Sequence, residues 1–417
     1  MENDYKATGR LGLYNDADGR MMLGGKPFYG IGVNYYDLFL SATSRDWDTG
    51  PSRRAMRTLK DYGCKVIRFS TLPFYVEEFG YFEQTEQYWK AMDEIVAEAE
   101  RLGIGLLPSL FWTYAVNDYC DEPYQTAYLD DNSKTVQFME RYIGDFVRRY
   151  ADSPAIYGWE FSNERVLGSD FPDASHFRAL HAKSKRQCRD ESDRVTLDGL
   201  NAMYRRFAAC VSQADPHGRI ISTGDTNPRE TSYNQYARGD FHTKDTHEEH
   251  EKVLDIINPA GITALSQHQY SYGEVLDPGE ETYPLLDYFN TWSSFFAYLM
   301  EMAGKRRMST YAGEVGYAHV HPENYGAITL EGATRPFYEA VVAQRKTGIP
   351  LILFWNYDPV SVPQNPDYVY DRGTGIEYSF SEHSPRGKRI LEIMKEGNQI
   401  LDSEYDGCEV SQNGKAN

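Results

Sequence analysis

The sequence lacks long apolar runs and any ordered arrangement of cysteines. No segment stays apolar for the ~18 residues or more that a membrane-spanning helix requires, so we expect no membrane span. The five cysteines are scattered and form no Cys-x-x-Cys motif. Their spacing therefore predicts neither a zinc site nor a disulfide framework.

Positive charge is also scarce, because 43 lysines and arginines face 62 aspartates and glutamates, for a net charge of −19. An acidic surface repels nucleic acid and anionic membranes, so we expect neither as a partner. The first ten residues, Met1 to Arg10, are polar and mixed in charge, unlike a signal peptide. Two locations fit: the cytoplasm, or the outside of the cell with a signal peptide absent from this sequence.

The composition is that of an ordinary globular protein, with 41% apolar and 25% charged residues in 417. This length fits one α/β barrel with long loops. Aromatic residues are frequent at 14%, including 33 tyrosines and 6 tryptophans. Their flat faces and polar tips suit sugar rings, although most of them must serve packing.

Short apolar runs alternate with longer helical patterns along the chain, which predicts a parallel sheet built from βαβ units. We predict eight strands, at Phe28–Val33, Lys65–Phe69, Ile104–Ser109, Ile156–Phe161, Arg219–Ser222, Ile262–Ser266, Met308–Ala312 and Pro350–Phe354. We predict eight helices, at Ser52–Tyr62, Glu86–Leu102, Lys134–Tyr150, Leu197–Gln213, His247–Ile257, Leu285–Ala303, Arg335–Lys346 and Ser384–Leu401. Eight such units predict a single (β/α)8 TIM barrel spanning about residues 28–402.

Three segments lie outside this repeat. Asp18-Gly19 predicts an N-terminal β-hairpin at about residues 8–27. A polar insertion from about Arg165 to Asp193 exceeds the usual loop length, so we expect it to carry some helix or to shape a rim. The polar tail, residues 403–417, is expected to fray. We predict one catalytic domain for the whole chain.

Polar and aromatic residues follow the predicted strands, where TIM barrels keep their chemistry. The apolar run from Ile156 ends in Asn163-Glu164, and Glu314 follows the seventh strand. Two carboxylic acids on separate strand ends are what glycosidic bond cleavage needs. The other strand ends carry Asn34-Tyr35-Tyr36, Arg68, Phe111-Trp112, Thr223-Gly224-Asp225, His268-Gln269-Tyr270 and Trp355-Asn356.

In these segments the chain resembles the (β/α)8 retaining glycoside hydrolases of clan A, most closely family 5, the cellulase and mannanase family. The resemblance covers about the whole chain and rests on motifs in strand order. They are Gly30-Ile31-Gly32-Val33-Asn34-Tyr35, Val66-Ile67-Arg68, Gly158-Trp159-Glu160-Phe161-Ser162-Asn163-Glu164, His268-Gln269-Tyr270, Gly313-Glu314-Val315-Gly316 and Phe354-Trp355.

The resemblance implies roles for individual residues, and it implies no cofactor and no metal. Glu164 would be the general acid/base, and Glu314 the nucleophile of a double displacement. Arg68 and the Tyr270 hydroxyl would keep Glu314 ionised. The remaining assignments concern the sugar: Asn163 would hold its 2-hydroxyl, His268 would orient the acid/base or a sugar hydroxyl, Trp355 would form the floor, and Trp112, Asn34 and Tyr35 would support binding.

Three features need separate interpretation. Family 5 usually has a histidine or asparagine near the third strand, where this chain has the stretch from Pro108 to Tyr114, so a plain cellulase assignment is unsafe. Glu160 and Asp225 are nearby acids that compete with the proposed pair. His247-x-x-His250 has a spacing that suggests metal, but we interpret it as part of a solvated, charged helix face.

The sequence leaves competing functions open. The leading hypothesis is hydrolysis of a β-linked poly- or oligosaccharide through a covalent glycosyl-enzyme. A non-catalytic carbohydrate-binding barrel, a transglycosylase with the same residues, and a metal-dependent hydrolase are the alternatives. The absence of paired histidines at strand ends disfavours the metal-dependent enzyme. Sugar, linkage and endo or exo action are not determined by the sequence.

Overall fold

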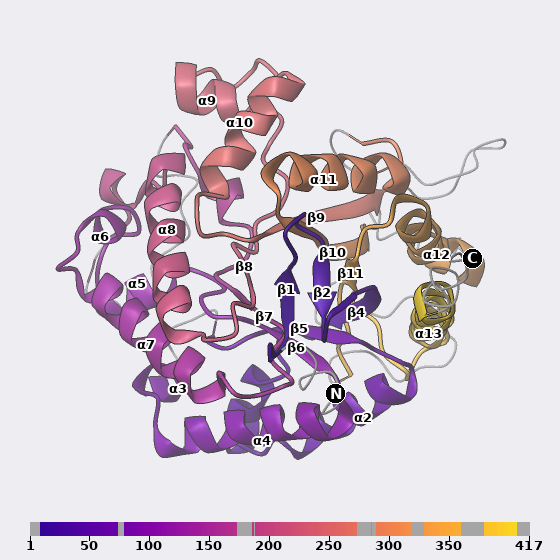
Figure 1. Cartoon of the computed structure of the whole chain (residues 1–417). Helices are drawn as coiled ribbons and strands as arrows, with labels where there is room; N and C mark the ends of the chain where they lie inside the picture. The colour runs from indigo at the N-terminus through magenta and orange to yellow at the C-terminus, as the bar shows by residue number, and fades with distance from the viewer. Residues whose placement is uncertain are drawn as a thin grey trace, which may run out of the picture.

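The computed structural model describes residues 9–73, 79–172, 186, 188–272, 285, 289–318, 329–359 and 379–406. In it, eight parallel strands form one sheet in the order β8-β7-β6-β5-β4-β11-β10-β9. The strands surround a common axis, and helices form an outer ring (Figure 1). Between the two end strands, the Thr263 amide donates to the Ile221 carbonyl at 2.9 Å, which nearly closes the barrel. The prediction of a TIM barrel is confirmed.

The barrel strands lie close to the predicted ranges. They are β4 (Gly30–Asn34), β5 (Val66–Ser70), β6 (Gly105–Ser109), β7 (Gly158–Glu160), β8 (Ile220–Ser222), β9 (Ala264–Tyr272), β10 (Ser309–Ala318) and β11 (Leu351–Phe354). Strands β9 and β10 continue well past the residues at which we predicted that they would end. Residues that we expected to follow these two strands therefore lie within them.

The helices that follow the strands also match the predicted series, with smaller helices in the loops. The α-helices are α2 (Gly50–Asp61), α3 (Phe79–Glu83), α4 (Glu86–Leu102), α5 (Ala115–Cys120), α6 (Thr126–Leu129), α7 (Lys134–Tyr150), α8 (Leu197–Ala214), α9 (Ser232–Arg238), α10 (His247–Ile257), α11 (Trp292–Arg306), α12 (Leu330–Thr347) and α13 (Pro385–Asp406). The 3-10 helices are η1 (Leu40–Arg45), η2 (Arg165–Gly168) and η4 (Glu191–Asp193).

Local capping explains why several helices begin and end where they do. The Thr85 side chain accepts the Tyr88 amide at the start of α4, and Gly103 ends this helix in the left-handed conformation. The helix predicted from Leu285 instead begins at Trp292, because Thr291 and Ser294 form a capping box. Leu285 itself pairs with Ser271 in an isolated antiparallel bridge.

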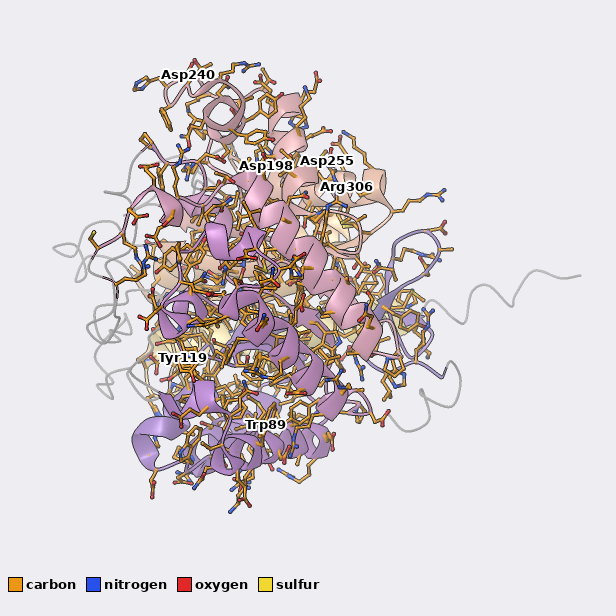
Figure 2. The ribbon with its side chains drawn as sticks, turned by 90° about the vertical axis from the view of Figure 1, so that its left-hand side faces the viewer. Trp89, Tyr119, Asp198, Asp240, Asp255 and Arg306 are labelled. Atoms are coloured by element: carbon orange, nitrogen blue, oxygen red, sulfur yellow. The ribbon has the colours of Figure 1, made fainter. Side chains whose placement is uncertain are left out.

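The outer ring of helices exposes charged side chains. Seen from the side (Figure 2), Asp198 and Asp255 lie on the outside of the helical ring, and both are exposed. Among the described helices, none has both the length and the apolar content for a membrane span. Of the insertion after Glu164, the structure describes η2, η4 and short adjoining stretches. Residues 173–185 and 187 lie outside the described part. The tail predicted to fray from residue 403 begins instead as helix, because α13 continues to Asp406, and its residues beyond 406 lie outside the described part.

The N-terminal hairpin closes the lower end of the barrel, where the strands begin. Strands β1 (Leu13–Asn15), β2 (Met21–Leu23) and β3 (Lys26–Pro27) form a separate antiparallel sheet, which confirms the predicted hairpin. In Figure 1 the hairpin lies in front of the barrel centre. Leu13, Met21 and Phe28 pack on a buried apolar cluster inside the barrel. The other members of that cluster are Val66, Leu107, Tyr157, Ile220, Ala264, Tyr311, Leu351 and Leu353.

Candidate active site

Arg68 organises the polar side chains at the upper end of the barrel, where the strands end. The guanidinium is fully buried, and its Nε donates to Glu160 at 2.7 Å. Its Nη1 donates to Asn34 and to Glu314, each at 2.9 Å. Its Nη2 donates to the Asn163 side chain at 2.8 Å. One arginine on β5 therefore joins groups from β4, β7 and β10.

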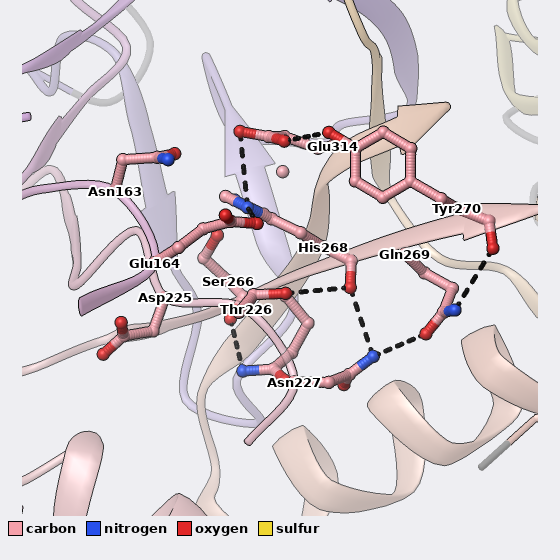
Figure 3. A network of polar contacts seen from close by, with 12 residues as sticks. Asn163, Glu164, Asp225, Thr226, Asn227, Ser266, His268, Gln269, Tyr270 and Glu314 are labelled. Atoms are coloured by element: carbon pink, nitrogen blue, oxygen red, sulfur yellow. Dashed lines mark hydrogen bonds and ion pairs between the residues drawn. The ribbon is translucent and has the colours of Figure 1, made fainter. Parts of the chain in front are cut away.

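Of the two predicted carboxylates, Glu314 is the one whose two oxygens both accept hydrogen bonds. Arg68 donates to its Oε1, and the Tyr270 hydroxyl donates to its Oε2, as Figure 3 shows for Tyr270. Burial raises the pKa of Glu314, while His268, Arg68 and Tyr270 act in the opposite direction. Because two donors satisfy its oxygens, Glu314 is the carboxylate of the pair that is better suited to remain ionised.

A β-bulge aims Glu314 into the site. The register between β9 and β10 shifts after Ala312, so that Glu314 lies opposite His268. The extra residue is Gly313, whose carbonyl accepts from the Asn34 amide at 2.9 Å. Bulges commonly re-aim a side chain next to an active site. Asn34 is thus fully buried and supports the site from below rather than lining its surface.

Glu164 has a different environment from Glu314. Its backbone is left-handed, with φ at 51°, and its amide donates to the Gly224 carbonyl at 3.0 Å. The side chain contacts Nδ1 of His268 at 2.9 Å. Burial raises the pKa of Glu164 to about 7, and Arg68 and Thr226 only partly oppose this shift. The carboxyl is therefore able to carry a proton near neutral pH, as a general acid must.

His268 lies between the two acids (Figure 3). Its Nδ1 is 2.9 Å from Glu164 and 3.3 Å from Glu314. Burial lowers the pKa of His268 to about 4, so the imidazole is neutral at pH 7. One oxygen of each carboxyl group and one ring nitrogen of His268 lie within 4.8 Å of one another.

These three side chains also have the composition of a metal site, but their contacts favour another role. Both oxygens of Glu314 already accept hydrogen bonds, from Arg68 and from Tyr270. A guanidinium in contact with a ligand oxygen opposes a nearby cation by charge repulsion. The donors around Glu314 thus fit a free carboxylate better than a metal ligand.

Aromatic rings surround the acids. Trp355 lies 6.0 Å from Tyr36 and 6.2 Å from Trp112 between ring centroids, in nearly parallel planes. Arg68 covers Trp112, with its guanidinium carbon 4.4 Å from the ring centroid. Trp355 and Trp112 therefore both belong to the site region, and their predicted contacts with a sugar stay predictions.

Tyr35 is a correction to the sequence analysis. We predicted that it would support substrate binding, but its side chain is 0% exposed and packs edge-on against Tyr357. Successive side chains alternate between the two faces of a strand. With Asn34 facing the barrel interior, Tyr35 points outward to the core, and Tyr36 is the residue that reaches Trp355.

Glu160 has a part that was not predicted from the sequence. Glu160 is fully buried, and its two oxygens accept from Arg68 at 2.7 Å and from the Tyr311 hydroxyl at 2.8 Å. Glu160 is near the catalytic candidates in sequence, but in the structure Arg68 lies between Glu160 and Glu314 and bonds both. The local signal for this buried role is an isolated acid within the apolar run Ile156–Phe161.

Two further expectations have clear outcomes. Asp225 points away from the two central acids in Figure 3, and it accepts from the Tyr204 hydroxyl at 2.6 Å. Burial raises the pKa of Asp225 to about 7. The interpretation of His247-x-x-His250 as a solvated face is wrong for His250, which is 4% exposed and contacts the Tyr298 hydroxyl at 2.6 Å.

Comparisons with known proteins agree with this geometry. No family model matches the chain. The chain is similar to a family 5 mannosidase structure from Rhizomucor miehei, with a TM-score of 0.62 and 13% identity. The match covers 95% of this chain and 100% of that one. An endo-β-1,4-mannanase from Thermotoga petrophila matches with a TM-score of 0.58 and 16% identity, over 91% of this chain and 79% of that one. The chain has the fold of glycoside hydrolase family 5.

Sequence similarity points to the same family. A probable mannan endo-1,4-beta-mannosidase C from Aspergillus terreus is 25% identical over 260 residues. The match covers 53% of this chain and 58% of that protein, so the chain spans little more than half of the relative's length. The resemblance to clan A family 5 that the motifs indicate is confirmed.

Proposed function

We propose that this barrel is a retaining glycoside hydrolase that cleaves β-linked mannosidic bonds. The observation that carries the proposal is the unequal pair of acids. Glu164 has a pKa raised to about 7, while Glu314 accepts hydrogen bonds from Arg68 and Tyr270. Environments that differ in this way divide acid and nucleophile roles between two carboxyl groups.

The proposed reaction has two steps. In the first, the Glu314 carboxylate attacks the anomeric carbon while the Glu164 carboxyl protonates the departing oxygen. In the second, the water oxygen attacks the anomeric carbon while ionised Glu164 takes a proton from that water. The bond to Glu314 breaks, and the sugar is released. An oxygen–oxygen distance within 4.8 Å supports this scheme, since retaining enzymes hold the carboxyl groups about 5–5.5 Å apart and inverting enzymes about 6.5–9.5 Å.

His268 would serve as a positioning residue in this scheme. A neutral imidazole beside both acids fixes the Glu164 carboxyl without adding a positive charge that would lower its pKa. Asn163 would hold the sugar 2-hydroxyl, and its side chain is itself fixed by Arg68 at 2.8 Å. Trp355 would provide the apolar surface under the reacting sugar.

The choice of mannosides comes from the relatives, which are named as mannan endo-1,4-beta-mannosidases, and from the mannosidase and mannanase structures. The test is activity on β-1,4-mannan, β-1,4-mannooligosaccharides, cellulose, galactan and aryl β-glycosides. Proton NMR of the first product gives the anomeric configuration. We expect β-mannose ends first; an initial α-anomer would exclude the retaining mechanism, and no product from any substrate would favour a binding protein.

The same panel separates the remaining alternatives. A transglycosylase would give longer oligosaccharides at high substrate concentration, which mass spectrometry detects. A metal-dependent hydrolase would lose its activity after dialysis against EDTA. We expect full activity after this treatment, because Glu314 uses Arg68 and Tyr270 in place of a cation.

A further inference from the structure

Asp225 is a buried carboxylate at the upper end of the barrel that the proposed reaction does not use. It follows β8, is 0% exposed, and points away from the two central acids in Figure 3. Its Oδ1 accepts the Val166 amide at 2.9 Å, and its Oδ2 accepts the Tyr204 hydroxyl at 2.6 Å. Because a buried carboxylate is costly without hydrogen-bond donors, these two contacts hold Asp225 in one position.

The Val166 amide belongs to the turn that carries the candidate acid/base. Glu164 has a left-handed backbone, with φ at 51°, which residues other than glycine rarely adopt and which persists only where the surroundings hold it. The Glu164 amide donates to the Gly224 carbonyl at 3.0 Å, and the Leu167 amide donates to the Glu164 carbonyl at 3.2 Å. The Val166 amide donates to Asp225. Of these three bonds, the one to Asp225 uses a side chain, so a substitution is able to remove it.

The residues after Asp225 hold the partner of the acid/base. The Thr226 hydroxyl and the Asn227 side-chain amide donate to the His268 carbonyl at 3.2 and 3.1 Å (Figure 3). The His268 ring in turn contacts the Glu164 carboxyl at 2.9 Å. The segment that follows β8 is therefore joined to both sides of that contact: the turn at Glu164 and the backbone of His268.

Tyr204 connects Asp225 to the helical ring. It lies on α8 and is 0% exposed, and its ring packs edge-on against Phe161 with 5.4 Å between centroids. Its hydroxyl donates to Asp225, so the carboxylate is held between a packed helix on one side and the turn at Glu164 on the other.

We propose that Asp225 is a positioning residue for the acid/base; this inference rests on the proposed glycosidase function. By accepting the Val166 amide and the Tyr204 hydroxyl, Asp225 fixes the left-handed turn. The turn in turn keeps the Glu164 carboxyl against His268. Proton transfer requires the acid within hydrogen-bond reach of the departing oxygen, so a small displacement of Glu164 slows it. Asp225 transfers no proton itself.

The experiment compares two aryl glycosides that share a glycone, either β-mannose or β-1,4-mannobiose, whichever the wild type cleaves faster. A dinitrophenyl leaving group needs no protonation, whereas a methoxyphenyl leaving group needs the acid in the first step. Asp225→Ala removes the acceptor of the Val166 amide. We expect it to lower kcat/KM for the methoxyphenyl glycoside by about tenfold or more relative to the dinitrophenyl glycoside.

The conservative variant Asp225→Asn is the first control. Its amide oxygen is able to accept from Val166, and its NH2 group is able to donate to the Tyr204 hydroxyl oxygen. We therefore expect Asp225→Asn to restore most of the wild-type ratio of the two rates. Restoration by an uncharged side chain would show that Asp225 acts through its hydrogen bonds.

A second pair of variants tests the inference even where Asp225→Ala fails to fold. Tyr204→Phe removes the hydroxyl that holds Asp225 and keeps the ring, so we expect a smaller change of the rate ratio in the same direction. The matched control is Tyr298→Phe on α11, which removes another buried tyrosine hydroxyl, the one that contacts His250 at 2.6 Å. Tyr298→Phe should keep the wild-type ratio.

The outcomes separate this inference from the proposed function. A selective loss on the methoxyphenyl glycoside that Asp225→Asn restores supports the positioning role. Equal losses on both glycosides, no loss on either, or a selective loss that Asp225→Asn shares would overturn it while the wild type remains a glycosidase. If the wild type cleaves neither glycoside, the proposed function is wrong and this inference falls with it.

Discussion

The two ends of the barrel are built from the same eight strands but have opposite chemistry. The lower end is an apolar cluster closed by the hairpin, with Leu13 and Phe28 packed against barrel side chains. The upper end buries the Arg68 cation together with two acids, Glu160 and Glu314. Burying apolar surface stabilises the fold, whereas burying charge is costly unless every group is paired. Stability and chemistry are thus separated along each strand.

Tyr311 marks the boundary between the two ends. Its ring belongs to the apolar cluster, while its hydroxyl donates to Glu160 at 2.8 Å. Glu160 in turn holds Arg68, so the packing of the lower end is connected to the charge arrangement of the upper end. Substitutions at each end should therefore affect different quantities, and the following experiments test that separation.

The largest effect is expected from removing the candidate nucleophile. Glu314→Gln should lower kcat by roughly 10⁴-fold or more, as with the loss of other covalent nucleophiles. The fold should persist, since the amide oxygen is able to accept from Arg68 and the amide NH2 to donate to the Tyr270 hydroxyl oxygen. Steady-state kinetics and thermal unfolding check this. The control is Glu248→Gln, a surface acid with 81% side-chain exposure; a fully active Glu314→Gln would exclude the assignment.

A smaller and substrate-dependent loss is expected at Glu164. General acid catalysis contributes typically about 10²–10⁴-fold, so Glu164→Gln should lose that much on oligosaccharides. Glycosides with an activated leaving group, such as dinitrophenolate, need no protonation in the first step and should lose much less in it. Measuring pre-steady-state release of dinitrophenolate gives the comparison. Equal losses on both substrate types would show that Glu164 does not act as the acid.

The pH dependence should show which form of Glu164 is active. With its pKa raised to about 7, the carboxyl is protonated below this pH and ionised above it. The first step needs the protonated form, so kcat/KM should fall about tenfold per pH unit above about pH 7. On the acidic side, activity should fall as Glu314 becomes protonated. A rate that stays constant from pH 6 to 9 would contradict the role of Glu164.

The smallest effect on activity is expected at the lower end of the barrel. Leu13 is 1% exposed, and Leu13→Ala should lower the free energy of unfolding by about 2–5 kcal/mol, as for other buried leucines. At temperatures where the variant remains folded, kcat should match that of the wild type. Urea unfolding and kinetics at low temperature measure the two quantities, with Leu129→Ala at a 58% exposed site as the control. A collapse of kcat in the folded variant would disprove the separation of the two ends.

Much of this arrangement was predictable because apolar periodicity reports burial directly. The eight strands and the positions of Asn163, Glu164 and Arg68 near their ends follow from it. The direction of single side chains was harder to predict. Tyr35 and Tyr36 are adjacent aromatics, and only strand alternation around Asn34 decides which one reaches Trp355. The sequence alone does not show where that alternation begins.

Other features depend on contacts between distant segments. The bulge at Gly313 turns Glu314 toward His268. No local sequence pattern predicts this bulge. Likewise, the Glu160 carboxylate accepts hydrogen bonds from Arg68 and Tyr311, which lie far from it in the chain. His250 is buried by Tyr298, from the next helix along the chain. Such partners become visible only when the strands and helices are assembled.

The backbone at Glu164 has a consequence for how this protein is able to change. The residue is held in a left-handed conformation by the Gly224 carbonyl, on the neighbouring strand end, and a side chain at Gly224 would meet the Ser162 carbonyl at 1.9 Å. The placement of the acid therefore depends on two strand ends, a glycine and the first turn of the insertion, where the Leu167 amide donates to the Glu164 carbonyl at 3.2 Å. Mutation and recombination beyond that turn are able to remodel the insertion while these contacts hold the acid.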